Sequence, residues 1–199
     1  MARSSKKASL RKREILENFY QVLAEEGLEG ASIAKVAARM GIHPSLIIHY
    51  FSTKEEMVVD LVDYILHIYE DTFLPPLNKI KDPKERLEKT IEAVFGLDWT
   101  RLADSGVFYA CYSLSFRNRR VREQFQKMYS RLREVLVEEI TEYMEKKIII
   151  KSDPYKLADL IVSLVQGYDF YRSLMDNDEQ FDELALFLKE NTLAILKID

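Results

Sequence analysis

The sequence predicts an all-α protein in which an N-terminal head of three helices is joined by one long helix to a helical body. Apolar residues recur at helical spacing along most of the 199 residues, and no alternating run rich in Val, Ile and Thr indicates a strand. The chain has only six glycines and five prolines, and several of them stand where one apolar pattern ends and another begins. These observations favour short connections between helices and argue against a sheet.

Composition is typical of a globular protein. The hydrophobic content of 47% is enough for a core. The one cysteine, Cys111, cannot form an internal disulfide, which suits a reducing cytosol. No apolar run approaches the ~18 residues that span a membrane, and Glu14 and Glu17 follow the basic N-terminus where a signal peptide would be apolar. We therefore expect a soluble, cytoplasmic protein.

Charge is distributed unevenly along the chain. The formal net charge is −4, but residues 1–54 carry nine Lys or Arg against five Glu, and residues 55–199 carry 20 basic against 28 acidic side chains. The first part is therefore +4 and the rest is −8. A basic head on an acidic body is typical of proteins whose head faces nucleic acid, although a solvated basic tail has the same composition.

The first helix is predicted from about Ser9 to Glu26. Gly27 can adopt the left-handed conformation that ends a helix. Residues 1–8 are polar and basic, so we expect them to form a disordered arm. The apolar residues that fall at i, i+4, i+7 and i+8 on the first helix are Ile15, Phe19, Val22 and Leu23.

A helix-turn-helix is predicted in the stretch SIAKVAARMGIHPSLIIHYFSTK, which runs from Ser32 to Lys54. Ser32 suits the N-cap of a first short helix, and Gly41 suits the sharp turn that follows it. Pro44 suits the first position of a second helix, because an N–H there would have no partner in the helix. The second helix of such a motif enters the DNA major groove. The residues expected on the inner face of this second helix are Ile47, Tyr50 and Phe51.

The run GIHPSLIIHYFSTKEE resembles the DNA-binding signature of the TetR family of bacterial transcriptional regulators. The resemblance implies an all-α fold, with a DNA-binding head and a body that binds a ligand and a second copy of the chain. The body stretch DPYKLADLIVSLVQGYDF loosely resembles the BetI-type branch, which is named for a choline-responsive regulator; choline is not carried over. The residues that match the head signature directly are Gly41, Ile42, Tyr50, Phe51, Lys54 and Glu55.

The resemblance also implies which residues contact DNA. The chain departs from the family pattern at Ala34, where a guanine-reading Arg is common, and at Ile48, where a phosphate-binding Tyr is common. The operator sequence therefore stays open. Removing Lys54 is expected to weaken binding to all sequences and to lower the salt slope by about one. Phosphate contacts are expected from Ser32, Lys35, Tyr50 and Lys54. Contacts with base edges or the sugar-phosphate wall are expected from His43, which replaces the usual Ser or Thr cap, and from Pro44, Ser45, Ile48 and His49.

Helices are predicted for the rest of the chain as well. A long connecting helix runs from Lys54 to about Phe73 and ends before two prolines. We place the domain boundary before it, with a helix-turn-helix DNA-binding domain at 1–53 and a ligand-binding and dimerisation domain at 54–199. The segment SGVFYACYSLSF has apolar residues on nearly every side, so we expect a helix buried all round in the centre of the body. Other helices are predicted at 83–97, at 121–145, from Pro154 and from about Glu179.

The last two predicted helices carry more apolar surface than one core uses, which predicts a partner. Two copies of this pair would form a four-helix homodimer interface that is self-complementary under two-fold symmetry, as the resemblance implies. A monomer with a larger core is the alternative. The residues expected at the interface are Leu157, Leu160, Ile161, Leu164, Phe181, Leu184, Leu188 and Ile195.

Aromatic residues are concentrated in the predicted body. Tyrosine combines apolar area with a polar tip, which suits a mostly apolar pocket with a few polar anchors. With Asp169 among them, such residues could form a cage for a cationic lipophile, since aromatic faces attract cations. Ordinary core packing is the alternative for each of them. The residues expected to bind a ligand are Trp99, Phe108, Tyr109, Tyr112, Phe116, Tyr168, Asp169 and Tyr171.

Together these features predict a ligand-responsive transcriptional repressor that binds a palindromic operator as a homodimer and is released by a small lipophilic or cationic effector. Two alternatives stay open. One is a DNA-binding regulator controlled by a protein partner, and the other is a small helical enzyme. The sequence has no metal-ligand spacing, no Gly-rich phosphate loop and no nucleophile motif, so no catalytic residue, metal or cofactor is predicted.

Overall fold

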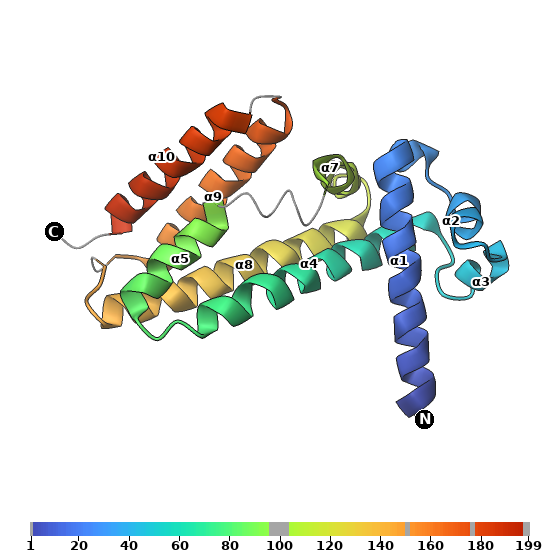
Figure 1. Cartoon of the computed structure of the whole chain (residues 1–199), viewed down its shortest axis with the longest axis horizontal. Coiled ribbons are helices and arrows are strands. Elements are labelled where there is room, and N and C mark those ends of the chain that lie inside the picture. Colours follow the sequence, from blue (N-terminus) through green and yellow to red (C-terminus); the bar gives the residue numbers. More distant parts are fainter. Residues whose placement is uncertain (1, 96–103, 150–151, 176–177, 197–199) are drawn as a thin grey trace. The chain divides into compact units, whose positions relative to one another are not determined.

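The computed structural model describes residues 2–95, 104–149, 152–175 and 178–196 (Figure 1). Within those ranges the structure contains α-helices and no β-strand, which confirms the all-α prediction. None of the helices in the described ranges is long and apolar enough to cross a membrane.

The chain divides into two compact units, which are described separately. Unit 1 comprises Met1–Ile68 and Leu102–Lys127, and unit 2 comprises Tyr69–Arg101 and Met128–Asp199. This division differs from the boundary predicted at residue 53, because α4 (Lys54–Asn78) and α8 (Arg119–Glu145) each have residues in both units. The predicted boundary separates functions, and it stays a prediction.

Unit 1 contains α1 (Ala2–Gly30), α2 (Ile33–Met40), α3 (Pro44–Ile48), the first part of α4, α7 (Ser105–Leu114) and the start of α8. Helix α1 begins at Ala2, so the residues predicted as a disordered arm are helical. Ala, Lys and Arg have high helix propensity, and two ion pairs along the helix, Arg11–Glu14 and Arg13–Glu17, support the same conformation. The regular turns stop at Gly27, whose φ is +69°, as predicted.

The core of unit 1 is built from the inner faces of its first four helices. The predicted face of α1 is buried, and so are the residues that face it from the helix-turn-helix and from α4. Figure 1 shows α2 and α3 beside α1. The buried set includes Ile15, Phe19, Val22 and Leu23 of α1, Val36 of α2, Ile47 of α3, Phe51, and Met57 and Leu61 of α4.

Helix α7 differs from its prediction. It belongs to unit 1 and packs against α1, and only one of its faces is buried, through Val107 and Cys111. Phe116, just beyond the end of α7, is 68% exposed. Some of the apolar side chains on and just after α7 are therefore not buried within the single chain. Asp104 is the N-cap of α7, since its Oδ1 accepts a hydrogen bond of 3.0 Å from the Val107 N–H. Burial raises the pKa of the Cys111 thiol to about 12, so it stays protonated.

Helix α4 also corrects a prediction, because it continues through Pro75 and Pro76 to Asn78. Proline removes a backbone donor and crowds the preceding turn, yet both prolines stand in the last turn and a half of the helix, where little helix follows. After them, the Lys79 N–H donates to the Pro76 carbonyl at 3.2 Å, which closes the helix end.

Unit 2 is built from the end of α4, α5 (Pro83–Phe95), most of α8, α9 (Pro154–Ser173) and α10 (Asp178–Leu196). These helices share one hydrophobic core, and α10 packs against both α5 and α9. The buried residues of that core include Leu87, Ile91 and Phe95 of α5, Leu136, Ile140 and Tyr143 of α8, Ile161 and Val165 of α9, and Leu196 of α10.

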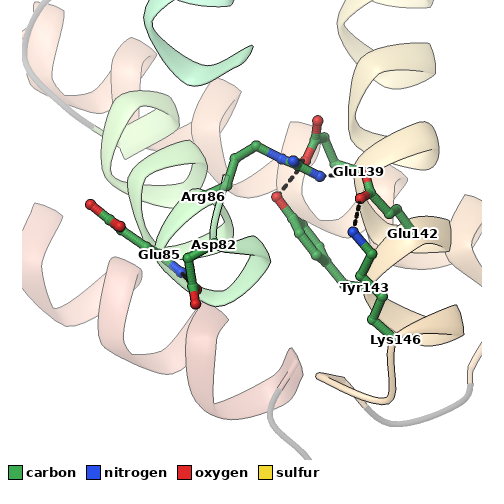
Figure 2. Close-up of polar contacts among 7 residues, drawn as sticks. All are labelled: Asp82, Glu85, Arg86, Glu139, Glu142, Tyr143 and Lys146. Atoms are coloured by element: carbon green, nitrogen blue, oxygen red, sulfur yellow. Dashed lines mark hydrogen bonds and ion pairs between the residues drawn. The ribbon is translucent and has the colours of Figure 1, made fainter. Parts of the chain in front are cut away.

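A charged cluster joins the start of α5 to the end of α8 (Figure 2). The Arg86 guanidinium is 13% exposed and donates to the carboxylates of Glu139, at 2.9 Å, and Glu142. It also lies 5.6 Å from the ring centroid of Tyr143, whose hydroxyl donates to Glu139. Burial, followed by the Glu139 carboxylate, raises the pKa of Tyr143, which therefore remains a donor. Arg86 thus pairs with two carboxylates at the edge of the core, and the Lys146 ammonium also pairs with Glu142.

We predict that Arg86→Met lowers the free energy of unfolding by about 2 kcal/mol, because Glu139 and Glu142 lose their shared cation while partly buried. The matched control is Lys89→Met, which removes a solvent-exposed pair with Glu92 and should change stability by less than ~0.5 kcal/mol. Urea unfolding of both variants measures the difference. Equal effects of the two substitutions would contradict the assignment.

Candidate nucleic-acid interface and aromatic clusters

The first helix of the predicted helix-turn-helix has both of its expected caps. Ser32 Oγ accepts a hydrogen bond of 3.3 Å from the Lys35 N–H at the start of α2. Gly41 ends α2 in the left-handed region, with φ +63° and ψ 33°, where a side chain is disfavoured. The Ile42 N–H then returns to the Ala37 carbonyl at 3.0 Å, which closes the turn.

Helix α3 is short and is held at both ends. His43 is its N-cap, and its Nδ1 accepts a 3.3 Å hydrogen bond from the Ser45 N–H. Ser45 Oγ lies 2.8 Å from the same nitrogen, so Nε2 is the ring atom left for other contacts. Ile47 is buried on the inner side, and Ile48 is 52% exposed on the outer side. The His43 cap and the buried Ile47 therefore hold α3 in place, and with it the side chains predicted to face outward.

The cations on α2 have acidic partners from α1. The Lys35 ammonium forms an ion pair with Glu26, and Arg39 Nη1 donates to both carboxylate oxygens of Glu25, at 2.7 and 2.8 Å. All four side chains are exposed, so each pair contributes little to stability. Arg39 was not among the predicted DNA contacts. Its place in the last turn of α2, next to the turn that leads to α3, could have indicated it.

The remaining two predicted phosphate contacts lie where α3 leads into α4. Tyr50 is half-buried, and its ring lies edge-on to His49 with the ring centroids 5.2 Å apart. Lys54 is partly buried, and its ammonium donates to the carbonyls of Leu28, at 2.8 Å, and Ala31, at 3.2 Å. No local sequence pattern predicts these two bonds, because each joins residues more than twenty positions apart.

The start of α4 is strongly capped. Thr53 Oγ1 accepts a hydrogen bond of 3.2 Å from the Glu56 N–H, and Glu56 Oε2 accepts one of 2.8 Å from the Ser52 N–H. This reciprocal pattern is close to a capping box. The Ser52 N–H, followed by the Arg120 guanidinium, lowers the pKa of the Glu56 carboxyl. The junction between α3 and α4 is therefore well defined.

The two compact units differ in charge in the same direction as the two predicted parts of the sequence. Unit 1 has 14 basic and 11 acidic side chains, a net charge of +3, and unit 2 has 15 basic and 22 acidic, a net charge of −7. The segment 117–122, which contains four arginines, adds positive charge to the unit that holds the helix-turn-helix. Such a distribution suits attraction of a polyanion to unit 1.

Four of the predicted ligand-binding residues form an aromatic cluster on and just after α7. The rings of Phe108 and Tyr112 are stacked, with centroids 6.4 Å apart, and both meet Phe125 of α8 edge-on, at 5.6 and 5.2 Å. Tyr109 and Phe116 contact this cluster in the same edge-on way. Phe125 was not among the residues predicted to bind a ligand. Trp99 lies outside the described residues.

The other predicted ligand-binding residues belong to unit 2. The buried Tyr168 donates its hydroxyl to the Phe181 carbonyl at 3.1 Å, and the ring of Tyr171 lies 5.1 Å from that of Phe181. Asp169 lies between these tyrosines in the sequence and is half-buried. The two aromatic groups thus belong to different units, and a pocket that includes both stays a prediction.

The predicted interface residues separate into two kinds. Ile161 and Phe181 are buried within the single chain, where they belong to its own core. Leu160 and Ile195 are exposed, and Leu157, Leu164, Leu184 and Leu188 are half-buried. Other large apolar side chains that were not among the predicted interface residues are exposed on or beside α9 and α10: Tyr155, Phe170, Leu174, Met175, Leu186 and Phe187.

A short, doubly capped helix-turn-helix on a positively charged unit defines the class of the protein as a helix-turn-helix DNA-binding regulator. Two family models match the chain: residues 15–61 match "Bacterial regulatory proteins, tetR family", and residues 82–198 match "Tetracyclin repressor-like, C-terminal domain". The second match covers more than half of the sequence. The chain belongs to the TetR family of transcriptional regulators, which are not enzymes.

Individual relatives are distant in sequence. The HTH-type transcriptional regulator BetI of Rhizobium meliloti (strain 1021) is 21% identical over 165 residues, which are 83% of this chain and 79% of that protein. A putative transcriptional regulator from Saccharomonospora viridis, solved in complex with choline, is 19% identical, with a TM-score of 0.83 over 96% of this chain and 100% of that one. The fatty acid degradation regulator FadR from Bacillus halodurans is 20% identical, with a TM-score of 0.73 over 93% and 99%. At these identities the structures establish the fold alone.

Proposed function

We propose that this protein is a cytoplasmic, ligand-responsive repressor that binds a palindromic operator as a homodimer. The proposed binding to DNA rests on how α3 is packed against the rest of unit 1. Its inner side is anchored by Ile47, and its outer side presents Ser45, Ile48 and His49. A short helix whose outer face presents polar and aliphatic side chains can enter the DNA major groove and contact the base edges.

Roles within this interface follow from side-chain chemistry. Lys35 and the Ser32 hydroxyl at the start of α2 would bind phosphate, as would the Tyr50 hydroxyl on the far side. Ser45 and the Nε2 atom of His49 can hydrogen-bond to base edges, and Ile48 can press on a thymine methyl. His43 and Pro44 would face the same groove wall. DNA would compete with Glu26 for Lys35, because the ion pair between them is exposed and weak.

We predict that the protein binds one site in its own upstream DNA, or a site selected from random DNA, far more tightly than it binds random sequence. Ile48→Ala should weaken operator binding by roughly five-fold, since it loses about 1 kcal/mol of apolar base contact, and should leave random-DNA binding unchanged. Leu10→Ala is the matched control, because Leu10 is similarly exposed on α1 outside the helix-turn-helix. Fluorescence anisotropy measures all three proteins. A wild type without operator preference would refute the repressor proposal.

The dimer proposal rests on apolar surface. Among the described residues of unit 2, nine large apolar side chains on or beside α9 and α10 are exposed outside its buried core. Exposed apolar area of this kind is typical of subunit interfaces, and a second copy would supply a complementary surface by two-fold symmetry. Two DNA-binding heads would then reach two half-sites of one palindrome.

We predict that Phe187→Glu, at a position 59% exposed on α10, shifts the protein from dimer to monomer, because a carboxylate would be desolvated in an apolar interface. The control is Leu10→Glu, which introduces the same charge at a position 60% exposed on α1. Analytical ultracentrifugation at micromolar concentration gives the mass of each variant. A wild-type monomer, or a dimer that survives Phe187→Glu, would refute this interface.

The effector proposal rests on the aromatic groups. Phe108, Tyr112 and Phe125 form a cluster of ring faces and edges in unit 1. Tyr168, Asp169 and Tyr171 are a separate candidate group on α9 of unit 2. Such residues suit a lipophilic or a cationic ligand. The choline complex of the S. viridis regulator and the fatty-acid regulator FadR support testing these two classes first. An effector that prefers one conformation weakens DNA binding by the factor by which DNA weakens its own binding.

We predict that at least one of two ligands, choline or a long-chain fatty acid, raises the melting temperature of the protein and releases the protein from its operator. Asp169→Asn should weaken binding of the cation by roughly ten-fold and leave that of the fatty acid unchanged, because only the cation uses the carboxylate charge. Thermal shift and anisotropy titrations with both ligands measure these effects. If neither ligand acts on either readout, neither class is the effector, and control by a protein partner becomes the candidate to test.

A further inference from the structure

The ammonium of Lys54 already has protein partners in the free protein. It donates to the Leu28 carbonyl at 2.8 Å and to the Ala31 carbonyl at 3.2 Å, and the side chain is partly buried. An ammonium has three donors, so at least two of them are used inside the chain. A residue expected to reach outward to phosphate therefore points inward to the backbone.

The two carbonyls need such a donor. They follow Gly27, where φ of +69° and ψ of 177° break the regular turns of α1. Carbonyls at a helix end lack amide partners, and a cation is favoured there by the helix dipole. Ala31 is also buried, and it directly precedes Ser32, the N-cap of α2. Lys54 thus satisfies backbone groups at the point where α1 leads into α2.

These bonds also close a loop around the helix-turn-helix. The segment from Leu28 to Lys54 contains all of α2, the turn and α3. Lys54 is the first residue of α4, whose start is fixed by the Thr53 cap and by the bond from the Ser52 N–H to Glu56. The entry to the motif and its exit are therefore held together by one side chain. A shift of α4 would move that side chain and the entry to α2 with it.

We propose that Lys54 is a positioning residue: it holds the helix-turn-helix at a set orientation on α4, and this orientation, more than a phosphate contact, is its contribution to operator recognition. The inference rests on the proposed DNA-reading function of α3. A phosphate ligand acts on every DNA sequence and on the salt slope, whereas a positioning residue acts on the fit of α3 to one sequence.

The test compares Lys54→Met with Lys35→Met, since both remove one ammonium and keep an apolar stem. Lys54→Met is expected to weaken operator binding by roughly ten-fold, with random-DNA binding and the slope of log K against log salt unchanged. Lys35→Met, at an exposed position, should weaken both DNAs alike and lower the slope by about one. Lys54→Arg, which keeps donors for the carbonyls, should restore most of the operator affinity. A slope lowered by about one in Lys54→Met, with equal loss on both DNAs, would overturn the proposal.

A second readout does not depend on DNA. Amide hydrogen exchange of the free protein should become faster across residues 28–41 in Lys54→Met and stay unchanged there in Lys35→Met, because only the first loses the bonds at the entry to α2. Unchanged exchange in Lys54→Met would refute the positioning role even if no operator were found. A wild type without operator preference, combined with faster exchange in Lys54→Met, would instead refute only the proposed repressor function.

Discussion

The burial of Ile47, on the inner face of α3, is the constraint on which the proposed DNA-binding surface depends. A helix of five residues is too short to be stable in water by itself, because helix nucleation costs more than so few hydrogen bonds return. Its shape therefore comes from packing: Ile47 and Phe51 are buried in the core of unit 1, and so is Phe19 of α1. Once that inner side is fixed, the direction of every outward side chain on α3 follows.

The junction between α3 and α4 extends this constraint into the rest of the chain. Local caps at Thr53 and Glu56 fix where α4 begins, and the long-range bonds of Lys54 fix what lies beside it. Helices α4 and α8 both have residues in the two compact units, but only α4 begins directly after the recognition helix α3. Coupling between unit 2 and the recognition helix requires a physical element that both sites act on, and α4 is the candidate for it.

The two units differ in charge and in exposed apolar surface. Unit 1 combines positive charge with a helix-turn-helix, whereas unit 2 is acidic and exposes large apolar side chains on α9 and α10. Positive charge attracts the DNA polyanion at a distance, and apolar area stabilises contact with another protein surface. Helix α7 has an intermediate character, since it packs on α1 yet leaves several aromatic rings partly uncovered.

Much of the fold could be predicted because its signals are local. The caps at Ser32 and Asp104 and the left-handed turn at Gly41 depend on a few consecutive residues, and the structure has each of them. Predictions failed where an element depends on what it meets. Helix α7 was expected to be buried all round, but hydrophobicity shows only that a face is apolar, and whether another chain, a ligand or solvent covers it is a separate matter. The prolines of α4 were read as a stop, although a helix tolerates them near its end.

The sequence by itself determined the helical class, the helix-turn-helix, its family and the side chains that face outward from α3, because periodicity, caps and a contiguous signature contain that information. Only the tertiary structure decided the partners of the charged residues. Lys54 meets carbonyls of Leu28 and Ala31, Lys35 meets Glu26, and Arg86 joins two carboxylates of α8. These contacts join segments separated in the sequence, and a long flexible cation can reach any of several partners. Which one it meets is set by how the helices pack.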